Sequence, residues 1–206
     1  MEITLDEKKQ SNKTIDFYNS QAKQYISETV DLDISNIRNR FLELIPENGH
    51  ILDLGCGSGR DSRFFLDHGY LVTAIDASYE LANLASEFIG QKVRNLSFHE
   101  LDYIETFIGI WACASLLHSP KVEMSTVMQK MTLALKPNGI IYMSFKYGSN
   151  ERVDERGRFF NDYTEADISK MLLEHSDLHI IQIFTESKPL RNGFQKWLNV
   201  FAKKDK

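Results

Sequence analysis

The 206-residue sequence predicts an α/β protein in which helices cover both faces of a mostly parallel sheet. Short apolar runs alternate with amphipathic runs, and a glycine-rich loop follows the first apolar run. The last two apolar runs have no helical pattern between them. Alternation of strands with helices is typical of a doubly wound parallel sheet, and the final pair is expected to form an antiparallel edge hairpin.

The predicted elements follow from the spacing of apolar residues and from capping and turn residues. Strands are expected at 50–54, 70–75, 93–98, 107–113, 140–145, 178–185 and 197–202. Helices are expected at 13–29, 34–45, 59–68, 78–89, 120–136 and 164–175. A turn is expected at 137–139 and a linker at 186–194.

The composition favours one folded domain and excludes several classes of protein. Hydrophobic residues make up 42% of the chain and charged residues 26%, enough for a substantial core. The net charge of −5 argues against a protein that grips a phosphate backbone. The two cysteines, Cys56 and Cys113, have no spacing typical of a metal site or a disulfide framework. Without a leader-like segment or an apolar run of about 18 residues, a cytoplasmic location is expected.

The strongest functional signal is the segment Asp53–Gly59, which reads DLGCGSG. Glycines allow a tight turn and a close approach of a ligand to the backbone. Asp76 ends the next strand, about 20 residues later, where an acid can hold ribose hydroxyls. The spacing GxGxG differs from the GxGxxG of dinucleotide sites, and Asp53 would repel a pyrophosphate. An acid there suits a ligand with an ammonium group, such as the amino-acid part of S-adenosylmethionine (SAM).

The DxGxGxG loop followed by an acid at the end of the second strand is similar to the class I SAM-dependent methyltransferase family. The resemblance covers residues 13–203. It implies a Rossmann-like, doubly wound, seven-stranded sheet, SAM as methyl donor and S-adenosylhomocysteine as product. It also implies a helical cap over about 13–45, and the long segment 146–163 is expected to form a lid or binding loop.

The resemblance implies roles for individual residues. The glycine loop would wrap the methionine part of the cofactor, Asp76 would bind the ribose, and residues after the third and fourth strands would flank the adenine and line the site. The expected cofactor contacts are Asp53, Gly55, Cys56, Gly57, Ser58, Gly59, Asp76, Ala77, Ser78, Ser97, Phe98, Ala112 and Cys113. Asp102 is an alternative acid in a shifted loop. Tyr18 and Tyr25 are expected either to contact the cofactor from a lid or to pack their helix on the core.

Residues for an acceptor are expected near the exits of the fourth and fifth strands. His118 is a candidate general base, with a structural hydrogen-bonding role as the alternative. The candidates for an acceptor pocket, which could take an anionic group, are Lys146, Tyr147, Arg158 and Tyr163; the alternative is a solvated loop. Gly157-Arg158-x-Phe160 followed by Tyr163 resembles bacterial methyltransferases loosely labelled tellurite-resistance-like.

A small-molecule acceptor is the interpretation that remains after elimination. The segment after the fourth strand lacks the Asn/Asp-Pro-Pro-aromatic motif of nucleic-acid amino-methyltransferases, and Cys113 follows Ala112 instead of a proline. A monomer or a homodimer is expected. The alternatives are a non-catalytic regulatory or partner-binding module that keeps the fold and a nicotinamide-dependent oxidoreductase, which the loop spacing and Asp53 oppose.

Overall fold

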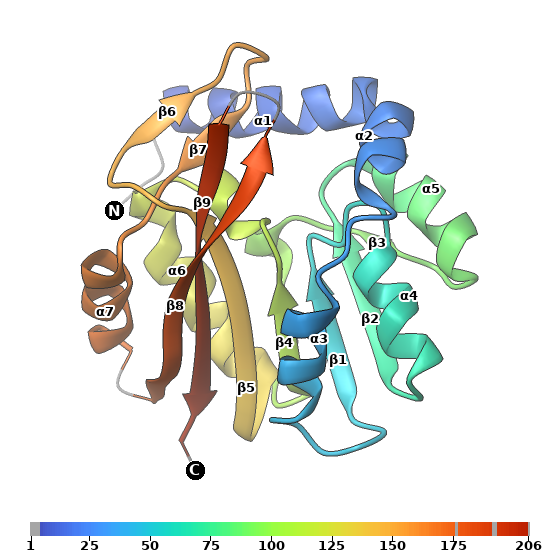
Figure 1. Ribbon diagram of the computed structural model, residues 1–206, viewed down its shortest axis with the longest axis vertical. Coiled ribbons are helices and arrows are strands. Elements are labelled where there is room, and N and C mark those ends of the chain that lie inside the picture. The colour runs from blue at the N-terminus through green and yellow to red at the C-terminus, as the bar shows by residue number, and fades with distance from the viewer. Residues whose placement is uncertain (1–4, 176, 191–192, 206) are drawn as a thin grey trace.

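The computed structural model describes residues 5–175, 177–190 and 193–205. A seven-stranded sheet with the order β3-β2-β1-β4-β5-β9-β8 forms its middle layer (Figure 1). The strands are β1 (His50–Leu54), β2 (Leu71–Asp76), β3 (Arg94–Asn95), β4 (Phe107–Ala112), β5 (Leu135–Lys146), β8 (Leu178–Leu190) and β9 (Gly193–Lys204). The first five strands pair in parallel, and β9 pairs antiparallel with both β5 and β8. The predicted Rossmann-like sheet with an antiparallel edge hairpin is therefore confirmed.

Helices pack on both faces of this sheet and cap one end of it. The helices are α1 (Leu5–Ser20), α2 (Ala22–Thr29), α3 (Ser35–Leu42), α4 (Arg60–Asp67), α5 (Tyr79–Ile89), α6 (Lys121–Ala134) and α7 (Glu165–Leu173). Residues of α6 and α7 share one buried cluster, and residues of α3, α4 and α5 share another. Two short 3-10 turns, η1 (Phe98–Glu100) and η2 (Leu116–His118), follow β3 and β4. None of the helices in the described ranges is long and apolar enough to cross a membrane.

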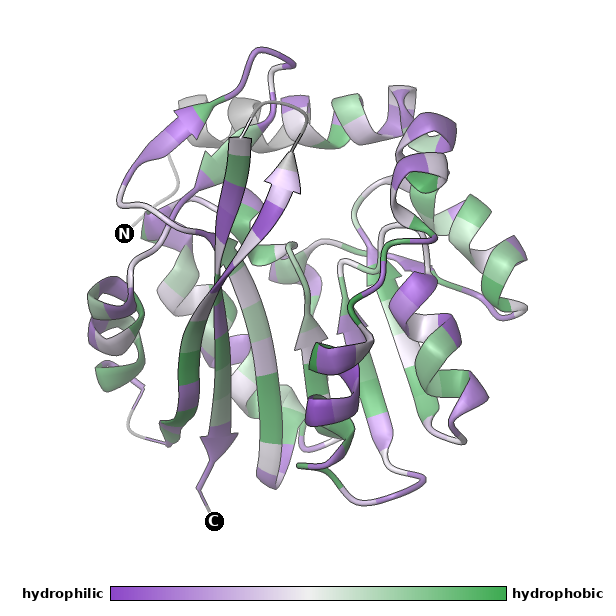
Figure 2. Ribbon diagram, in the orientation of Figure 1, coloured by the Kyte–Doolittle hydropathy of each residue, from purple (hydrophilic) through white to green (hydrophobic). Residues whose placement is uncertain are grey.

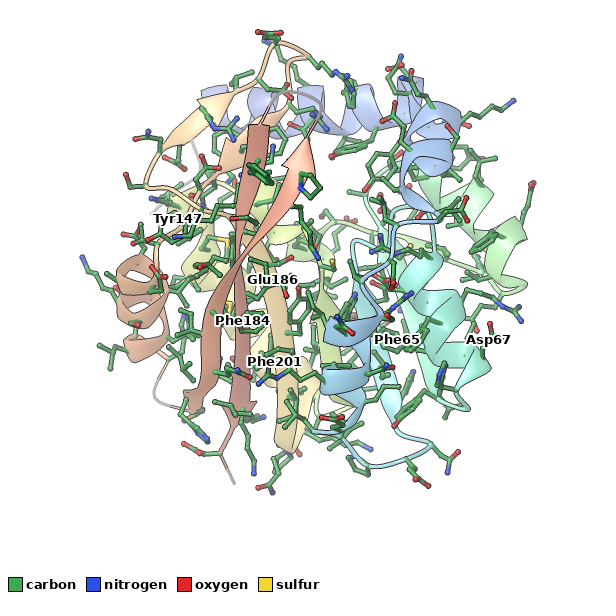
Figure 3. All side chains as sticks on the ribbon, in the orientation of Figure 1. Phe65, Asp67, Tyr147, Phe184, Glu186 and Phe201 are labelled. Atoms are coloured by element: carbon green, nitrogen blue, oxygen red, sulfur yellow. The ribbon has the colours of Figure 1, made fainter. Side chains whose placement is uncertain are left out.

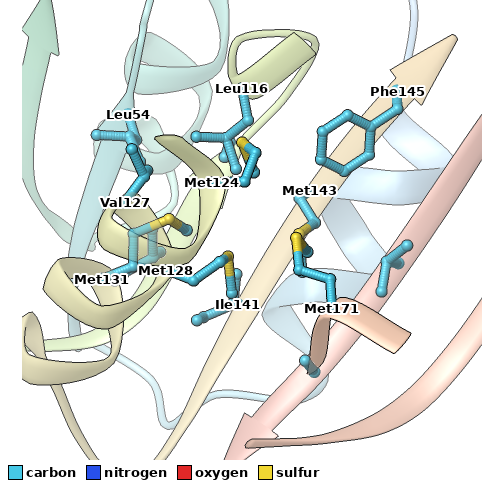
Figure 4. Close-up of a cluster of buried hydrophobic side chains, with 14 of the residues drawn as sticks. Leu54, Leu116, Met124, Val127, Met128, Met131, Ile141, Met143, Phe145 and Met171 are labelled. Atoms are coloured by element: carbon cyan, nitrogen blue, oxygen red, sulfur yellow. The ribbon is translucent and has the colours of Figure 1, made fainter. Parts of the chain in front are cut away.

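The alternation of side chains along each strand explains the two clusters. Leu52 and Leu54 of β1 point to the α6 side, whereas Ile51 points to the α4 side. The α6 side is rich in methionine, and Met128, Met131 and Met143 lie among the side chains of Figure 4. Figure 2 shows hydrophobic residues along the central strands and mixed character on the outer helices.

A cap lies above the carboxyl ends of the parallel strands (Figure 1). It consists of α1, α2 and a small hairpin formed by β6 (Glu151–Val153) and β7 (Phe159–Asn161). This hairpin occupies the 146–163 segment predicted to be a loop. The Phe159 N–H donates to Thr14 Oγ1 over 3.0 Å, which joins the hairpin to α1.

Several predicted boundaries differ from the structure. The helix expected at 13–29 is two helices, because Gln21 departs from helical geometry with φ −110° and ψ 13°. Residues 137–139 belong to β5, where the register with β4 shifts and Asn138 has φ 63°. The linker expected at 186–194 lies largely in β8 and β9, which pair up to Leu190 and Gly193. Pro189 is tolerated because β8 is an edge strand.

Candidate cofactor and acceptor site

A pocket opens at the carboxyl ends of β1, β2 and β4, beneath the cap. In open α/β sheets this edge, where the strand order reverses between β1 and β4, is the usual ligand position. The lining residues are Thr14, Ile15, Tyr18, Tyr25, Gly55, Gly57, Asp76, Ala77, Ser78, Leu81, Ser97, Phe98, His99, Ala114, Ser115, His118, Ser119 and Glu123. Ten of the residues predicted from sequence are thus brought together: Tyr18, Tyr25, Gly55, Gly57, Asp76, Ala77, Ser78, Ser97, Phe98 and His118.

The three loop glycines adopt positive φ values, but they serve different neighbours. A Cβ at Gly55 (φ 80°) would lie 2.5 Å from Ser115 Cβ, and one at Gly57 (φ 55°) would lie 3.1 Å from the Tyr25 ring. Because a side chain at either position would crowd these neighbours, bare backbone forms this part of the pocket wall. A Cβ at Gly59 would instead lie 2.8 Å from Ile89 Cγ2, so Gly59 allows α4 to begin against α5 and does not line the pocket.

Asp76 presents a fixed, buried carboxylate to the pocket. Its Oδ2 accepts the Gly57 N–H over 2.9 Å and its Oδ1 accepts the Ser78 N–H over 2.8 Å. Burial raises the pKa of Asp76 to about 6, against the lowering effect of these two hydrogen bonds. At neutral pH the group is therefore mostly ionised, and its remaining lone pairs can accept hydrogen bonds from hydroxyl groups.

Asp53 points away from the pocket, although it belongs to the same loop motif. Like Ile51, it lies on the α4 side of β1, where its Oδ2 accepts the Ser62 hydroxyl over 2.6 Å. Burial, together with the neighbouring charge of Asp61, raises the pKa of Asp53 to about 8. The acid is thus largely protonated at neutral pH, and its hydrogen bond to Ser62 links β1 to α4 behind the glycine loop. The predicted contact with a ligand ammonium stays a prediction.

Four further predicted cofactor contacts do not line the pocket. Cys56 and Ser58 are buried inside the loop, and Ala112 is fully buried in β4. The Cys113 sulfur lies 3.9 Å from Ser144 Oγ, and burial raises its pKa to about 12. The two cysteines are free thiols.

The four predicted acceptor-pocket residues also lie outside this pocket. Tyr163 packs in the core against Phe145, and Tyr147 lies near α7 (Figure 3), where a hydrogen bond to Glu165 raises its pKa. The Lys146 ammonium lies 3.6 Å from the centre of the Phe160 ring.

Arg158 forms an ion pair with Asp154 over 2.7 Å. It lines a second, outer hollow together with Tyr25, so that Tyr25 stands between the two cavities. The binding role predicted for these four residues stays a prediction.

The structure adds pocket residues for which no sequence motif gave a signal. Glu123 lies in the first turn of α6, and its Oε2 is 2.8 Å from Nε2 of His99, which also lines the pocket. Ser115 contributes a buried hydroxyl oxygen without a hydrogen-bond partner in the described structure. Asn19 Oδ1 accepts the Ser78 hydroxyl over 2.7 Å and so ties α1 to the start of α5. Only the fold brings these separated residues together.

The sheet order, the glycine loop and the acid at the end of β2 are those of the class I SAM-dependent methyltransferase fold. Residues 51–139 match a family described as a methyltransferase domain. That segment contains the loop, Asp76 and the exit of β4.

Curated relatives and solved structures agree with this assignment. The chain is 28% identical over 120 residues to a ubiquinone biosynthesis O-methyltransferase of Coxiella burnetii, covering 54% of this chain and 50% of the relative. It is 30% identical over 134 residues to the putative methyltransferase YqeM of Bacillus subtilis, covering 60% and 51%. The chain thus spans about half the length of these relatives.

The 1,6-didemethyltoxoflavin-N1-methyltransferase of Burkholderia thailandensis, solved with S-adenosylhomocysteine, has the same fold. It aligns with a TM-score of 0.76 and 22% identity over 100% of this chain and 92% of the other. A SAM-dependent methyltransferase of Methanosarcina mazei aligns with a TM-score of 0.72 and 21% identity over 84% and 99%.

Proposed function

We propose that this protein transfers a methyl group from SAM to a small molecule. The observation that carries the proposal is the buried Asp76 carboxylate, held by two backbone N–H groups at the edge of a pocket that the glycine loop also lines. An ionised acid in that position suits the hydroxyl pair of a ribose. Bound there, SAM would supply a methyl group on a positively charged sulfur.

The residues of the pocket fit such a ligand from end to end. Asp76 and Ser78 would hold the ribose side, Phe98 would flank the adenine, and the bare backbone at Gly55 would lie beside the amino-acid part. The free hydroxyl oxygen of Ser115 offers a polar partner at the same end as Gly55. The protein's contribution to the transfer would be to hold donor and acceptor in line and to exclude water.

The cap favours a small molecule as the methyl acceptor. Tyr18 and Tyr25 of α1 and α2 close the pocket from above, and β7 is hydrogen-bonded to α1 beside them. A capped, concave site of this kind suits a small molecule better than a polymer. One similar protein is named for ubiquinone biosynthesis and another for the methylation of 1,6-didemethyltoxoflavin, and both names refer to small molecules. We also propose a cytoplasmic location, which the two free thiols support.

The test is calorimetric titration of Asp76→Ala with S-adenosylhomocysteine. Losing hydrogen bonds from two hydroxyls to a charged acceptor, each worth about 1.5–3 kcal/mol, should weaken binding by at least about 100-fold. The control is Asp31→Ala, since Asp31 is an exposed acid that does not line the pocket. Unchanged affinity in Asp76→Ala, with the thermal unfolding transition retained, would refute the ribose assignment.

A further inference from the structure

Both ring nitrogens of His118 are engaged by the cap. His118 Nδ1 lies 2.6 Å from the Phe159 carbonyl oxygen of β7, and Nε2 lies 2.8 Å from the Tyr18 hydroxyl of α1. A carbonyl oxygen can only accept a hydrogen bond, so Nδ1 must carry the proton. In the neutral ring Nε2 is then bare, and the Tyr18 hydroxyl donates to it.

Three hydrogen bonds and one turn of α1 form a closed circuit that holds this pair in place. Tyr18 and Thr14 are one turn apart on α1. Thr14 Oγ1 accepts the Phe159 N–H, the Phe159 carbonyl accepts His118 Nδ1–H, and His118 Nε2 accepts the Tyr18 hydroxyl. Because the circuit connects α1, β7 and η2, the orientation of the Tyr18 hydroxyl depends on a closed cap.

The charges around the pair favour a neutral resting state. Burial, together with the cations Arg158 and Lys146, lowers the pKa of His118 to about 4, against the raising effects of the Phe159 carbonyl and of Asp154. Burial raises the pKa of Tyr18, and Arg158 opposes that shift. Arg158 therefore favours a negative charge on the Tyr18 oxygen if its proton moves to the ring.

The pocket around Tyr18 is aromatic. The Tyr18 ring meets Tyr25 edge-to-face at 5.1 Å and His118 at 5.3 Å, and all three residues line the pocket. Such edges and faces suit a planar aromatic ligand. Since Nε2 is already occupied by Tyr18, an acceptor in the pocket would meet the Tyr18 oxygen before it could reach the imidazole nitrogen.

Resting on the proposed methyl transfer, we propose that the acceptor is an aromatic hydroxyl and that Tyr18 is the catalytic residue that removes its proton, with His118 acting through Tyr18. The acceptor oxygen forms the new bond to the methyl carbon as the carbon–sulfur bond breaks and its electron pair stays on sulfur. The acceptor proton passes to Tyr18 Oη, and the Tyr18 proton passes to His118 Nε2. The resulting imidazolium keeps Nδ1–H on the Phe159 carbonyl.

A weak base is sufficient for this step. The acceptor oxygen becomes strongly acidic as the methyl group bonds to it, so its proton can move to a group as weakly basic as His118. A tertiary amine or thioether acceptor carries no proton to lose and would leave the Tyr18–His118 pair without a role. The pair therefore indicates an acceptor whose methylated atom bears hydrogen.

The experiment compares Tyr18→Phe and His118→Asn with the wild type and with the control Tyr79→Phe, which alters an exposed tyrosine outside the pocket. Catechol and phenol are the probe acceptors. Tyr18→Phe and His118→Asn should each lose at least about 100-fold in kcat, the usual contribution of a general base, whereas Tyr79→Phe should keep the wild-type kcat. The double variant should be no slower than either single variant, because both belong to one relay. Tyr18→Phe keeps its ring, so it remains informative where His118→Asn does not fold.

Nitrogen-15 NMR supplies a readout independent of turnover. The wild type at pH 7 should show His118 as the Nδ1-protonated tautomer, and Tyr18→Phe should shift the Nε2 resonance. Normal kcat in Tyr18→Phe, an Nε2-protonated ring, or no methylation of either phenol by a protein that binds S-adenosylhomocysteine would overturn the inference. Failure of the wild type to bind S-adenosylhomocysteine would instead refute the proposed function.

Discussion

Replacing Asp53 by asparagine should change how the stability of the protein depends on pH. Asp53 is 2% exposed, and its pKa is raised from an ordinary value of 3.8 to about 8 by burial and by Asp61. The folded protein therefore holds a proton on Asp53 that the unfolded chain has already released at pH 5. Asparagine keeps the size and neutrality of this acid but cannot titrate.

The magnitude follows from proton linkage. Where the folded state binds one proton more than the unfolded state, the free energy of unfolding falls by about 1.4 kcal/mol for each pH unit. For a group with a raised folded pKa this stability is complete below pH 4 and is lost as pH rises toward 8. Between pH 5 and pH 7 the wild type should lose about 2.7 kcal/mol that Asp53→Asn does not lose.

Urea unfolding at pH 5, 6 and 7 measures this difference. The fluorescence of the buried Trp111, whose Nε1 donates to Asp61 over 2.9 Å, reports the transition. The control is Asp67→Asn, because Asp67 lies at the surface end of α4 (Figure 3) and is half-exposed. A difference between wild type and Asp53→Asn that stays constant from pH 5 to pH 7 would contradict a buried, protonated Asp53.

Three further substitutions test the scaffold of the site. Gly59→Ala should destabilise more than Gly90→Ala by thermal unfolding, since both glycines have φ near 77° but a Cβ meets Ile89 only at Gly59; equal losses would remove the packing argument. Thr164→Ala should cost about 1 kcal/mol in urea, because the Thr164–Asp167 capping box starts α7; no loss would mean that the cap is redundant. Met128→Ala should cost about 2–5 kcal/mol by the same measurement, as expected for a fully buried side chain, and a smaller loss would indicate a core that collapses around the gap.

The sheet could be predicted because local patterns and chain connectivity agree. Apolar runs, the Thr164 capping box and the proline and glycine turns each mark an element without reference to the rest of the chain. The predicted ends of strands were wrong where pairing with a distant strand decides the conformation. The extension of β8 and β9 to Leu190 and Gly193 depends on main-chain pairing between the two strands. In the sequence alone, Pro189 indicated a linker at this place.

The cofactor end of the site was predictable for a related reason. Gly55, Gly57 and Asp76 belong to a motif whose spacing places them at the ends of adjacent strands. The direction in which Asp53 points could have been anticipated from alternation with Ile51, but the side on which the pocket opens is a property of the whole sheet. The contact between Tyr18 and His118, 100 residues apart, has no local signal.

The proposed SAM site is tested by titrating the wild-type protein with S-adenosylhomocysteine in a calorimeter, with NAD as the control. We expect S-adenosylhomocysteine to bind at one site per chain and NAD not to bind. Binding of NAD alone would contradict the assignment of the pocket, and binding of neither would contradict the proposal that Asp76 and the glycine loop form a SAM site.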